Sequence, residues 1–503
     1  MKRVLLLKPY QLLRDHQDCP QLGLLCLVTA LRRRFGDQVE VKVIDMKLER
    51  WSPEWLAEHF DDFDPDVVGV TALNCEADSA DRIASLVKAI KPQALTVLGG
   101  PYALHRAEEL LESTEFDWIF NGEADLSFPE ALDRHFHGAD LGTDIPGLSY
   151  RQADGHHISL GQDSIRDLDG LGLPAWDLVD FERYAGSNTF NSMMKGTRYA
   201  TIFTSRGCPY ECSYCHDLFG KKFRHRSAED VLAEIELLHE RYGVDEFAII
   251  DDIFNLHKPR LKKIMSEVCH RWPGKLHFCF PNGVRADLMD EEVVEALHRA
   301  GTYSISIAIE TVTERLQDLV QKHLNVEKAE KVIGYCDDRG IVTQGFFMLG
   351  FPTETVEEMK ATTDFAAKSR LTIAYFFTVV PQPATPLFDL AKAEDATALE
   401  GTVRDERRAQ SYRADSAWYQ RAYGFDLGRF MQIAYARFFL SPWRVLRIVT
   451  LVPTRSLLAG LTRLSAYLLR LGDGTGDSRK PSTRKRLTES VSGLIRGRGA
   501  ARA

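Results

Sequence analysis

The stretch YATIFTSRGCPYECSYC, residues 199–215, joins a β-rich apolar run to a loop that carries Cys208, Cys212 and Cys215. Three thiolates on one compact loop suit a soft metal site. A closed zinc site needs four ligands, commonly two paired knuckles, and the chain has no second C-x-x-C pair. Zinc with His216 as fourth ligand and three unrelated thiols are the alternatives. An iron–sulfur cluster accepts cysteines at this spacing, and three ligands on a four-iron cluster leave one iron open.

Around this loop, β-rich runs alternate with helical patterns such as 228–242, 291–300 and 326–339. Six βα units within residues 196–390 predict an incomplete, open β/α barrel. Active-site residues of such barrels lie at the carboxyl ends of the strands, which is where the cysteine loop falls. The predicted strands are 199–204, 246–250, 276–280, 304–309, 342–349 and 373–380.

Residues 1–140 show a second alternation of short strands and helices. It predicts an α/β fold with a doubly wound, Rossmann-like parallel sheet that binds its ligand at the carboxyl ends of the strands. No G-x-G-x-x-G follows the first strand, so the usual dinucleotide fingerprint is absent. The candidate binding residues at these ends are Thr71, Asn74, Gly99, Gly100 and Gly122. The predicted strands are 3–8, 39–45, 67–72, 95–98 and 118–120.

The remaining segments differ in composition. Residues 141–195 are rich in Gly, Asp and Pro and are predicted to connect the two α/β blocks. Residues 391–471 are predicted to form a helical region, and residues 472–503 a basic, disordered tail. From 428 to 503 there are 15 Lys plus Arg against 3 Asp plus Glu.

Composition bounds the class of protein. A chain of 503 residues allows about three domains. Its net charge of −9 argues against a protein that coats nucleic acid. Nine cysteines, an odd number, argue against a disulfide framework, and the chain has no run of about 18 apolar residues typical of a membrane span. We therefore expect a cytoplasmic globular protein.

The C-x-x-x-C-x-aromatic-C loop after the first barrel strand resembles that of the radical S-adenosylmethionine (SAM) superfamily. The resemblance implies that Cys208, Cys212 and Cys215 hold a 4Fe-4S cluster. The open iron of such a cluster chelates the amine and carboxylate of SAM, and its reduction yields a 5′-deoxyadenosyl radical. Tyr214, before the last cysteine, would lie near the adenine.

Further motifs follow later strands in the order that this resemblance requires. Residues 250–255, IDDIFN, resemble the D-D-x-F segment of one branch, so Asp251 and Asp252 would approach the methionine amine. Residues 282–285 match N-G-x-R, and 347–352 resemble the L-G-x-P turn. Glu310 ends a stretch similar to G-I-E and would hold the ribose or amino group of SAM. The alternative for Asp251 and Glu310 is a buried carboxylate that caps a helix.

The N-terminal block resembles the cobalamin-binding domain that is fused to many radical enzymes. The resemblance rests on DVVGVT at 66–71, GGP at 99–101 and NGE at 121–123. The D-x-H-x-x-G motif, whose histidine binds cobalt in other cobalamin proteins, is missing. The sequence therefore does not identify what lies on the lower face of cobalt. The alternative is a domain that binds no corrin.

Together, these resemblances imply a cobalamin-dependent radical SAM enzyme that methylates an unactivated carbon of a hydrophobic or specialised metabolite. One alternative keeps both cofactors but catalyses cyclisation or rearrangement without methyl transfer. A second is a non-catalytic iron–sulfur redox protein. The resemblance also implies a flavodoxin or ferredoxin as electron donor, and it assigns no catalytic side chain.

Residues 437–444, RFFLSPWR, resemble an aromatic–aromatic–x–x–P stretch near the end of several cobalamin-type radical enzymes that act on large apolar molecules. Arginines interleaved with apolar residues suit a helix at an anionic membrane surface, and with it a lipid-like substrate. The first alternative is a helix that packs on the barrel with its arginines in solvent. The second alternative, an arm that binds nucleic acid, is not expected.

Overall fold

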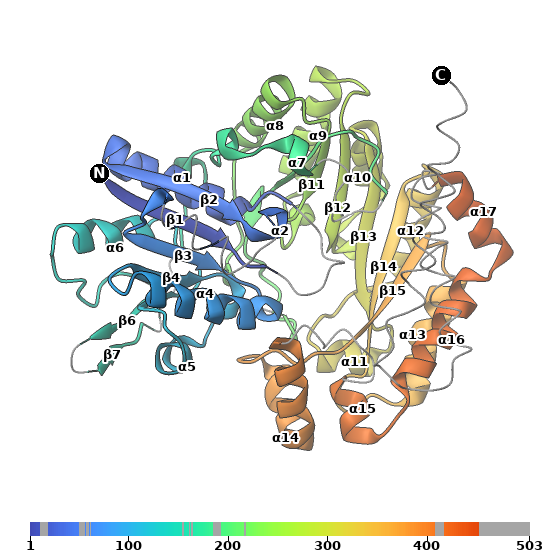
Figure 1. Ribbon diagram of the computed structural model, residues 1–503. Helices are drawn as coiled ribbons and strands as arrows, with labels where there is room; N and C mark the ends of the chain where they lie inside the picture. Colours follow the sequence, from blue (N-terminus) through green and yellow to red (C-terminus); the bar gives the residue numbers. More distant parts are fainter. Residues whose placement is uncertain are drawn as a thin grey trace, which may run out of the picture. The chain divides into compact units, whose positions relative to one another are not determined.

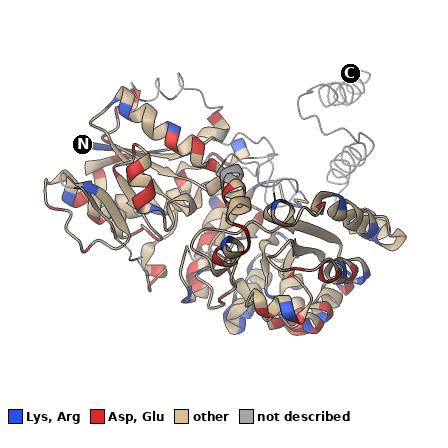
Figure 2. Cartoon of the chain, turned by 90° about the horizontal axis from the view of Figure 1, so that it is seen from below, with Lys and Arg blue, Asp and Glu red and all other residues tan. Residues whose placement is uncertain are grey.

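The computed structural model describes residues 1–10, 19–49, 56, 60, 62–152, 155–159, 161, 164–184, 193–215, 218–407 and 417–451. These residues lie in one compact unit, Met1–Val452. Basic and acidic residues are interspersed along its helices (Figure 2).

The first sheet is the doubly wound sheet that the sequence predicted. Its strand order is β2-β1-β3-β4-β5-β6-β7, and β1 to β5 are parallel. The order reverses at β1 (Figure 1). One apolar core lies on each face of the sheet. A ligand crevice is expected at this reversal. The strands are β1 (Lys2–Lys8), β2 (Val39–Asp45), β3 (Val67–Thr71), β4 (Leu95–Gly99) and β5 (Trp118–Phe120), and the main helices are α1 (Leu22–Phe35), α4 (Ala77–Ile90), α5 (Ala107–Ser113) and α6 (Ser127–Phe136).

The segment predicted as a connection between the blocks also contributes two strands to this sheet. β6 (Leu148–Gln152) pairs antiparallel with β5, and β7 (Gly155–His157) pairs with β6. Further along, Trp176 is buried, and its indole N–H donates to Glu234 at 2.8 Å. The connection is therefore packed against both blocks.

The second sheet is the open barrel. Its order is β15-β14-β13-β12-β11-β8, every neighbouring pair is parallel, and β8 and β15 remain as edges (Figure 1). Its strands are β8 (Tyr199–Ile202), β11 (Glu246–Ile249), β12 (His277–Val284), β13 (Thr302–Glu310), β14 (Val342–Leu349) and β15 (Ile373–Thr378). Its helices are α8 (Ala228–Tyr242), α9 (Lys258–Arg271), α10 (Glu291–Arg299), α11 (Glu314–Leu319), α12 (Val326–Asp338) and α13 (Val356–Lys368).

Local sequence explains where these helices begin. Ser227, Asp290 and Asn325 cap α8, α10 and α12, because each side chain accepts a hydrogen bond from a backbone N–H of the first turn. Thr355 and Glu358 form a capping box at the start of α13. These caps place the helices so that the loops after the strands gather at one end of the barrel.

The C-terminal region is helical, as expected, but two of its arginines, Arg444 and Arg447, are not where either interpretation put them. It contains α14 (Pro386–Arg407), α15 (Trp418–Tyr423), α16 (Leu427–Phe439) and α17 (Pro442–Leu451). Arg444 is buried, and Arg447 contacts Asp337, so both point inward. The predicted helical residues 452–471 and the predicted disordered tail, 472–503, lie outside the described residues. No described helix is long and apolar enough to cross a membrane.

Candidate functional site

A cavity of about 500 Å³ lies where the carboxyl ends of the two sheets meet. The N-terminal sheet contributes Thr71, Gly99, Gly100 and Gly122, which are four of the five residues predicted there. The barrel contributes, among others, Arg206, Asp252 and Asn282. The two blocks therefore share one cavity.

Backbone geometry at the end of β4 opens this cavity to a large ligand. Gly100 has φ +85°, and a Cβ there would come within 2.7 Å of the Thr71 hydroxyl oxygen. A Cβ at Gly99, by contrast, would meet no atom within 4 Å. Gly100 therefore allows the turn, and Gly99 leaves free space beside the backbone.

Asn74, the fifth predicted residue, has another role. It lies in the short helix η2 (Asn74–Glu76), and its side-chain amide donates to the Gln382 side chain at 2.8 Å. It thus links the N-terminal block to the segment after β15. Contact between Asn74 and a cofactor stays a prediction.

An ion pair that the sequence analysis missed lines the same cavity. Lys8, at the end of β1, pairs with Glu76 at 2.5 Å, and both side chains are buried. Glu76 also accepts from the backbone N–H of Leu73 at 2.8 Å. The sequence carries no signal for this pair, because the two residues are 68 positions apart.

The cysteine loop is held by backbone contacts. Gly207 has φ +81°, and a Cβ there would collide with the Lys222 carbonyl oxygen, so only glycine fits before Cys208. The Cys208 N–H donates to Gly220 at 3.3 Å, and the Cys215 N–H to Cys212 at 3.1 Å. Ser213 is buried between them and donates its N–H to Val320 at 2.9 Å. The three thiols are therefore displayed by a fixed loop.

The surroundings of Cys208 favour its neutral thiol over the thiolate. Burial raises the pKa of Cys208, and the nearby Asp252 carboxylate and Cys212 thiol raise it further. A bound metal reverses this balance, because thiolates are its ligands. Within the described residues, no three His, Cys, Asp or Glu side chains converge as one metal ion requires. A cubane makes no such demand, since each cysteine binds a different iron. His216, the alternative zinc ligand, lies outside the described residues.

The two neighbouring aspartates after β11 have different environments. Asp251 is buried, and its carboxylate accepts from the Thr204 N–H (2.6 Å), the Thr204 hydroxyl (2.5 Å) and the Ser205 hydroxyl (2.6 Å). Asp252 lines the cavity and accepts from the Gly207 N–H at 3.2 Å. Asp251 thus anchors the strand end before the cysteines, whereas Asp252 faces the space in which a ligand would lie. Contact of either with SAM stays a prediction.

Arg285, from the N-G-x-R match, fixes two loops at once. Its guanidinium carbon lies 3.8 Å from the centroid of the Tyr210 ring, within the cysteine loop. It also donates to the His323 backbone oxygen at 2.9 Å and pairs with Asp287 at 3.0 Å. Asn282 of the same motif donates to the Ile250 carbonyl at 2.6 Å. The motif therefore holds loops together rather than supplying a reactive group.

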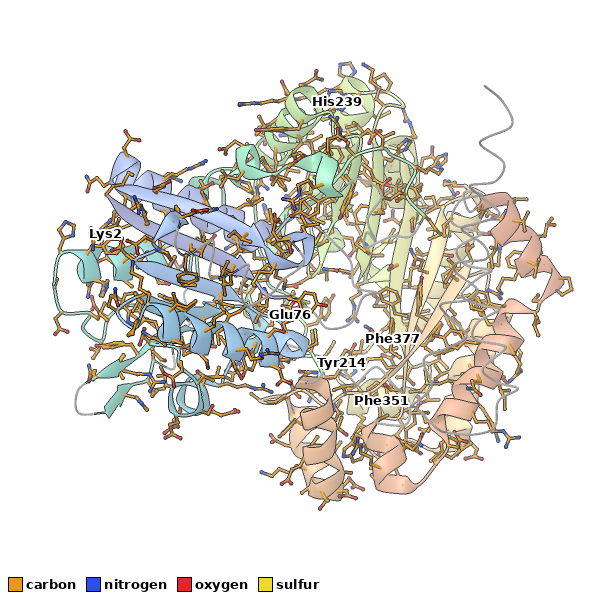
Figure 3. All side chains as sticks on the ribbon, in the orientation of Figure 1. Lys2, Glu76, Tyr214, His239, Phe351 and Phe377 are labelled. Atoms are coloured by element: carbon orange, nitrogen blue, oxygen red, sulfur yellow. The ribbon has the colours of Figure 1, made fainter. Side chains whose placement is uncertain are left out.

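Glu310 and Tyr214 meet at a lysine that the sequence analysis missed. The Lys322 ammonium lies 3.3 Å from a Glu310 carboxylate oxygen and donates to the Tyr214 hydroxyl at 3.1 Å. The three residues come from the cysteine loop, the end of β13 and the segment between α11 and α12. Tyr214 packs on Phe351 with ring centroids 6.2 Å apart (Figure 3). Burial raises the pKa of Tyr214, with Glu310 and Cys212 adding to the effect, so the phenol stays protonated.

This group is held by a strained backbone. Glu310 has φ +66°, after a register shift between β13 and β14. Gln321 and His323, on either side of Lys322, have φ of +52° and +48°. None of the three is glycine, and such conformations cost about 1–3 kcal/mol each and concentrate at functional sites. No glycine marks this loop, so the sequence gives no signal for it.

A buried ion-pair network joins the two blocks beside the cavity. Arg206, two residues before Cys208, contacts Glu123 at 2.7 Å and Asp125 at 2.8 and 3.1 Å. Arg224 pairs with the second oxygen of Glu123 at 2.5 Å. Burial alone would lower the pKa of Arg206, but Asp125 raises it overall. Two arginines thus balance two carboxylates, and the first of these, Glu123, directly follows the predicted Gly122 in the sequence.

These residues fit the cofactors that the sequence implies. Cys208, Cys212 and Cys215 would hold the cluster, because three thiols without a fourth described ligand match its donor set. Lys322 and Glu310 present opposite charges suited to the carboxylate and amine of an amino acid. The space beside Gly99 suits a large flat ligand such as cobalamin.

Comparison with known proteins agrees with this geometry. Residues 202–366 match the radical SAM superfamily, and residues 12–132 match the B12 binding domain. An uncharacterized methyltransferase of Pyrococcus horikoshii is 30% identical over 75% of this chain and 79% of its own. The cytidylyl-2-hydroxyethylphosphonate methyltransferase of Streptomyces wedmorensis is 29% identical over 76% and 80%. The anaerobic magnesium-protoporphyrin IX monomethyl ester cyclase of Rubrivivax gelatinosus is 28% identical over 70% and 63%.

Among solved structures, the radical SAM methyltransferase TsrM of Kitasatospora setae has the same fold. The TM-score is 0.65 at 22% identity, over 78% of this chain and 76% of that one. The matches confirm the predicted fold class, the predicted family and its three cofactors: the 4Fe-4S cluster, SAM and cobalamin. This chain belongs to the radical SAM enzymes that carry a B12-binding domain.

Proposed function

We propose that this enzyme transfers a methyl group to an unactivated carbon of a hydrophobic small molecule. The observation that carries the proposal is the single cavity shared by the carboxyl ends of both sheets, with Gly99 on one side and Asp252 on the other. The names of the Pyrococcus and Streptomyces relatives support methyl transfer. When bound, the cluster with SAM supplies hydrogen abstraction, and cobalamin supplies the methyl group.

The chain itself positions and shields the reacting molecules. Cys208, Cys212 and Cys215 hold the cluster, and Asp252 and Glu310 orient the amino group of SAM. Lys322 holds the Glu310 carboxylate in place across 3.3 Å. The Arg206 network closes the seam between the two blocks, which limits access of water to the cavity.

An aromatic wall inside the barrel supports a hydrophobic substrate. Phe347 and Phe376 are buried and face the helices, because they contact Phe365 of α13 and Tyr435 of α16. Side chains alternate along strands, so Phe346, Tyr375 and Phe377 face the interior of the barrel. Their ring centroids lie 5.5–6.0 Å apart, and Phe377 is 43% exposed. A wall of aromatic rings favours an apolar or flat substrate.

Domain assignments and electron supply belong to the same proposal. Residues 1–140 form the cobalamin domain, with 141–195 connecting it to the radical SAM barrel at 196–390. Residues 391–471 form a helical C-terminal region, followed by the tail. A flavodoxin or ferredoxin supplies the electron.

The test uses SAM and reduced cobalamin, and needs no knowledge of the substrate. The full chain, reconstituted without oxygen, is expected to form methylcobalamin and S-adenosylhomocysteine. With dithionite it should also release 5′-deoxyadenosine, and Cys212→Ala should lose that release. Formation of 5′-deoxyadenosine without any S-adenosylhomocysteine would contradict methyl transfer.

Oxidative cyclisation is the second candidate, favoured by the Rubrivivax cyclase among the relatives. Cyclisation predicts that 5′-deoxyadenosine forms while no S-adenosylhomocysteine is produced. With a substrate in hand, a product heavier by one CH₂ supports methylation, and a product of equal or lower mass supports cyclisation or rearrangement.

A further inference from the structure

Helix α17 has the reverse of the usual amphipathic arrangement. Its arginines face the protein, since Arg444 is 1% exposed and Arg447 is half-buried. Its apolar side chains face outward: Trp443 is 41%, Val445 47%, Leu446 62% and Val449 59% exposed. We call these four residues the α17 apolar face. A helix on a globular protein normally buries such residues and exposes its arginines.

The contacts of the arginines explain the inversion. Arg444 donates to the carbonyls of Ala367 (2.9 Å) and Ser369 (3.1 Å) at the carboxyl end of α13. Its guanidinium carbon stacks 3.5 Å from the Phe438 ring centroid. Arg447 donates to the Asp337 carbonyl at 2.6 Å, at the end of α12. Cations are stabilised at helix carboxyl ends, where carbonyls lack partners, so these two contacts lock α17 with its apolar side out.

The stretch of sequence that contains this face is basic. From residue 427 to 472 the sequence has seven arginines and no Asp or Glu. The chain then continues for 51 residues after Val452 with 11 Lys plus Arg against 3 Asp plus Glu. Arg437, on α16, is paired with Asp364 at 2.6 Å. An apolar helix face within a basic stretch matches the chemistry of an anionic lipid surface, which combines negative headgroups with apolar chains.

We propose that the α17 apolar face docks on an anionic lipid surface. Val445, Leu446 and Val449 enter the boundary between headgroups and acyl chains, with Trp443 beside them. Basic residues of the stretch other than Arg437, Arg444 and Arg447, which contact the protein, attract the headgroups. Binding to a lipid surface goes beyond the proposed function, and the test of this binding does not depend on methyl transfer.

The test is flotation of the full chain with vesicles. We expect binding to vesicles containing phosphatidylglycerol, little binding to pure phosphatidylcholine, and weaker binding as salt rises. Leu446→Glu with Val449→Glu should lower the bound fraction at limiting lipid at least about tenfold. Ile90→Glu, which alters an exposed apolar residue at the end of α4, is the matched control and should bind as the parent does. Circular dichroism and iron content show whether each variant is folded.

A second readout follows the helix itself. In the parent, the Trp443 indole should move from water into the lipid surface, so the tryptophan fluorescence should shift when vesicles are added. This shift should be smaller in Trp443→Phe, which lacks that indole. Binding that survives Leu446→Glu with Val449→Glu would assign attraction to the basic stretch alone and would overturn the proposal. Absence of binding to anionic vesicles would also overturn it. In that case, faster proteolysis of residues 453–503 in the double variant would show that the chain's own end covers the face.

Discussion

The ion-pair network between the two blocks gives the sharpest prediction. Arg206→Met removes three hydrogen bonds, at 2.7, 2.8 and 3.1 Å, and leaves the buried Asp125 carboxylate without a cation. Glu123 keeps its contact with Arg224. Removing one partner of a buried pair costs about 3–5 kcal/mol, because the remaining charge is stranded away from water. We expect a loss of this size in the free energy of unfolding.

The control for this variant is an exposed pair of similar geometry. Arg32 contacts both oxygens of Asp177, at 2.8 and 3.0 Å, and both side chains are exposed. An exposed pair contributes about 1 kcal/mol or less, so Arg32→Met should lower stability by no more than that. The double variant Arg206→Met/Asp125→Leu removes the stranded charge as well, and should recover about 2 kcal/mol or more of the loss.

The assay is equilibrium urea unfolding without oxygen, followed by far-ultraviolet circular dichroism. Equal losses for Arg206→Met and Arg32→Met would refute the reasoning, as would a double variant that is no more stable than the single one. Since Arg206 stands two residues before Cys208, we also expect Arg206→Met to release iron to a chelator faster than Arg32→Met does.

Four further variants test other parts of the structure. Lys322→Met should weaken SAM binding about 10- to 100-fold in equilibrium dialysis, because Glu310 and Tyr214 lose their shared cation, whereas an unchanged affinity would contradict the role of Lys322. Asp251→Asn should lower stability by about 1–3 kcal/mol, because an amide donor replaces an oxygen that accepts from hydroxyls. Asp252→Asn should instead leave the urea midpoint unchanged and reduce release of 5′-deoxyadenosine. A loss of stability in Asp252→Asn, with reduced 5′-deoxyadenosine release only in Asp251→Asn, would contradict the roles given to the two aspartates. Burial raises the pKa of Glu354 from 4.5 to about 8, so between these values the folded chain holds a proton that the unfolded chain releases. The free energy of unfolding should therefore fall as pH rises from about 5 to about 8. Glu354→Gln should flatten that slope in urea midpoints measured across this range, and an equal slope in both proteins would contradict the shift.

Much of the architecture could be read from the chain alone, because it depends on local pattern. Alternating apolar runs predicted the parallel strands of both sheets, and the spacing of Cys208, Cys212 and Cys215 indicated a metal-binding loop. These signals lie within a few residues of one another, where backbone periodicity and turn chemistry act. The same holds for the glycines at 99, 100 and 122, which stand at the ends of predicted strands.

The features that the sequence did not predict involve contacts between residues that are distant in the chain. Asp251 and Asp252 are adjacent, yet only folding brings Thr204 and Ser205 to the first and the cavity to the second. Lys322 reaches Tyr214 across 108 positions, and Arg444 turns inward because the ends of α12 and α13 offer carbonyls there. Strands β6 and β7 were not predicted, because a Gly- and Asp-rich stretch has weak strand propensity and pairs only when β5 is already present. Local preference sets which elements form, whereas burial and charge pairing across the folded chain decide what each side chain faces.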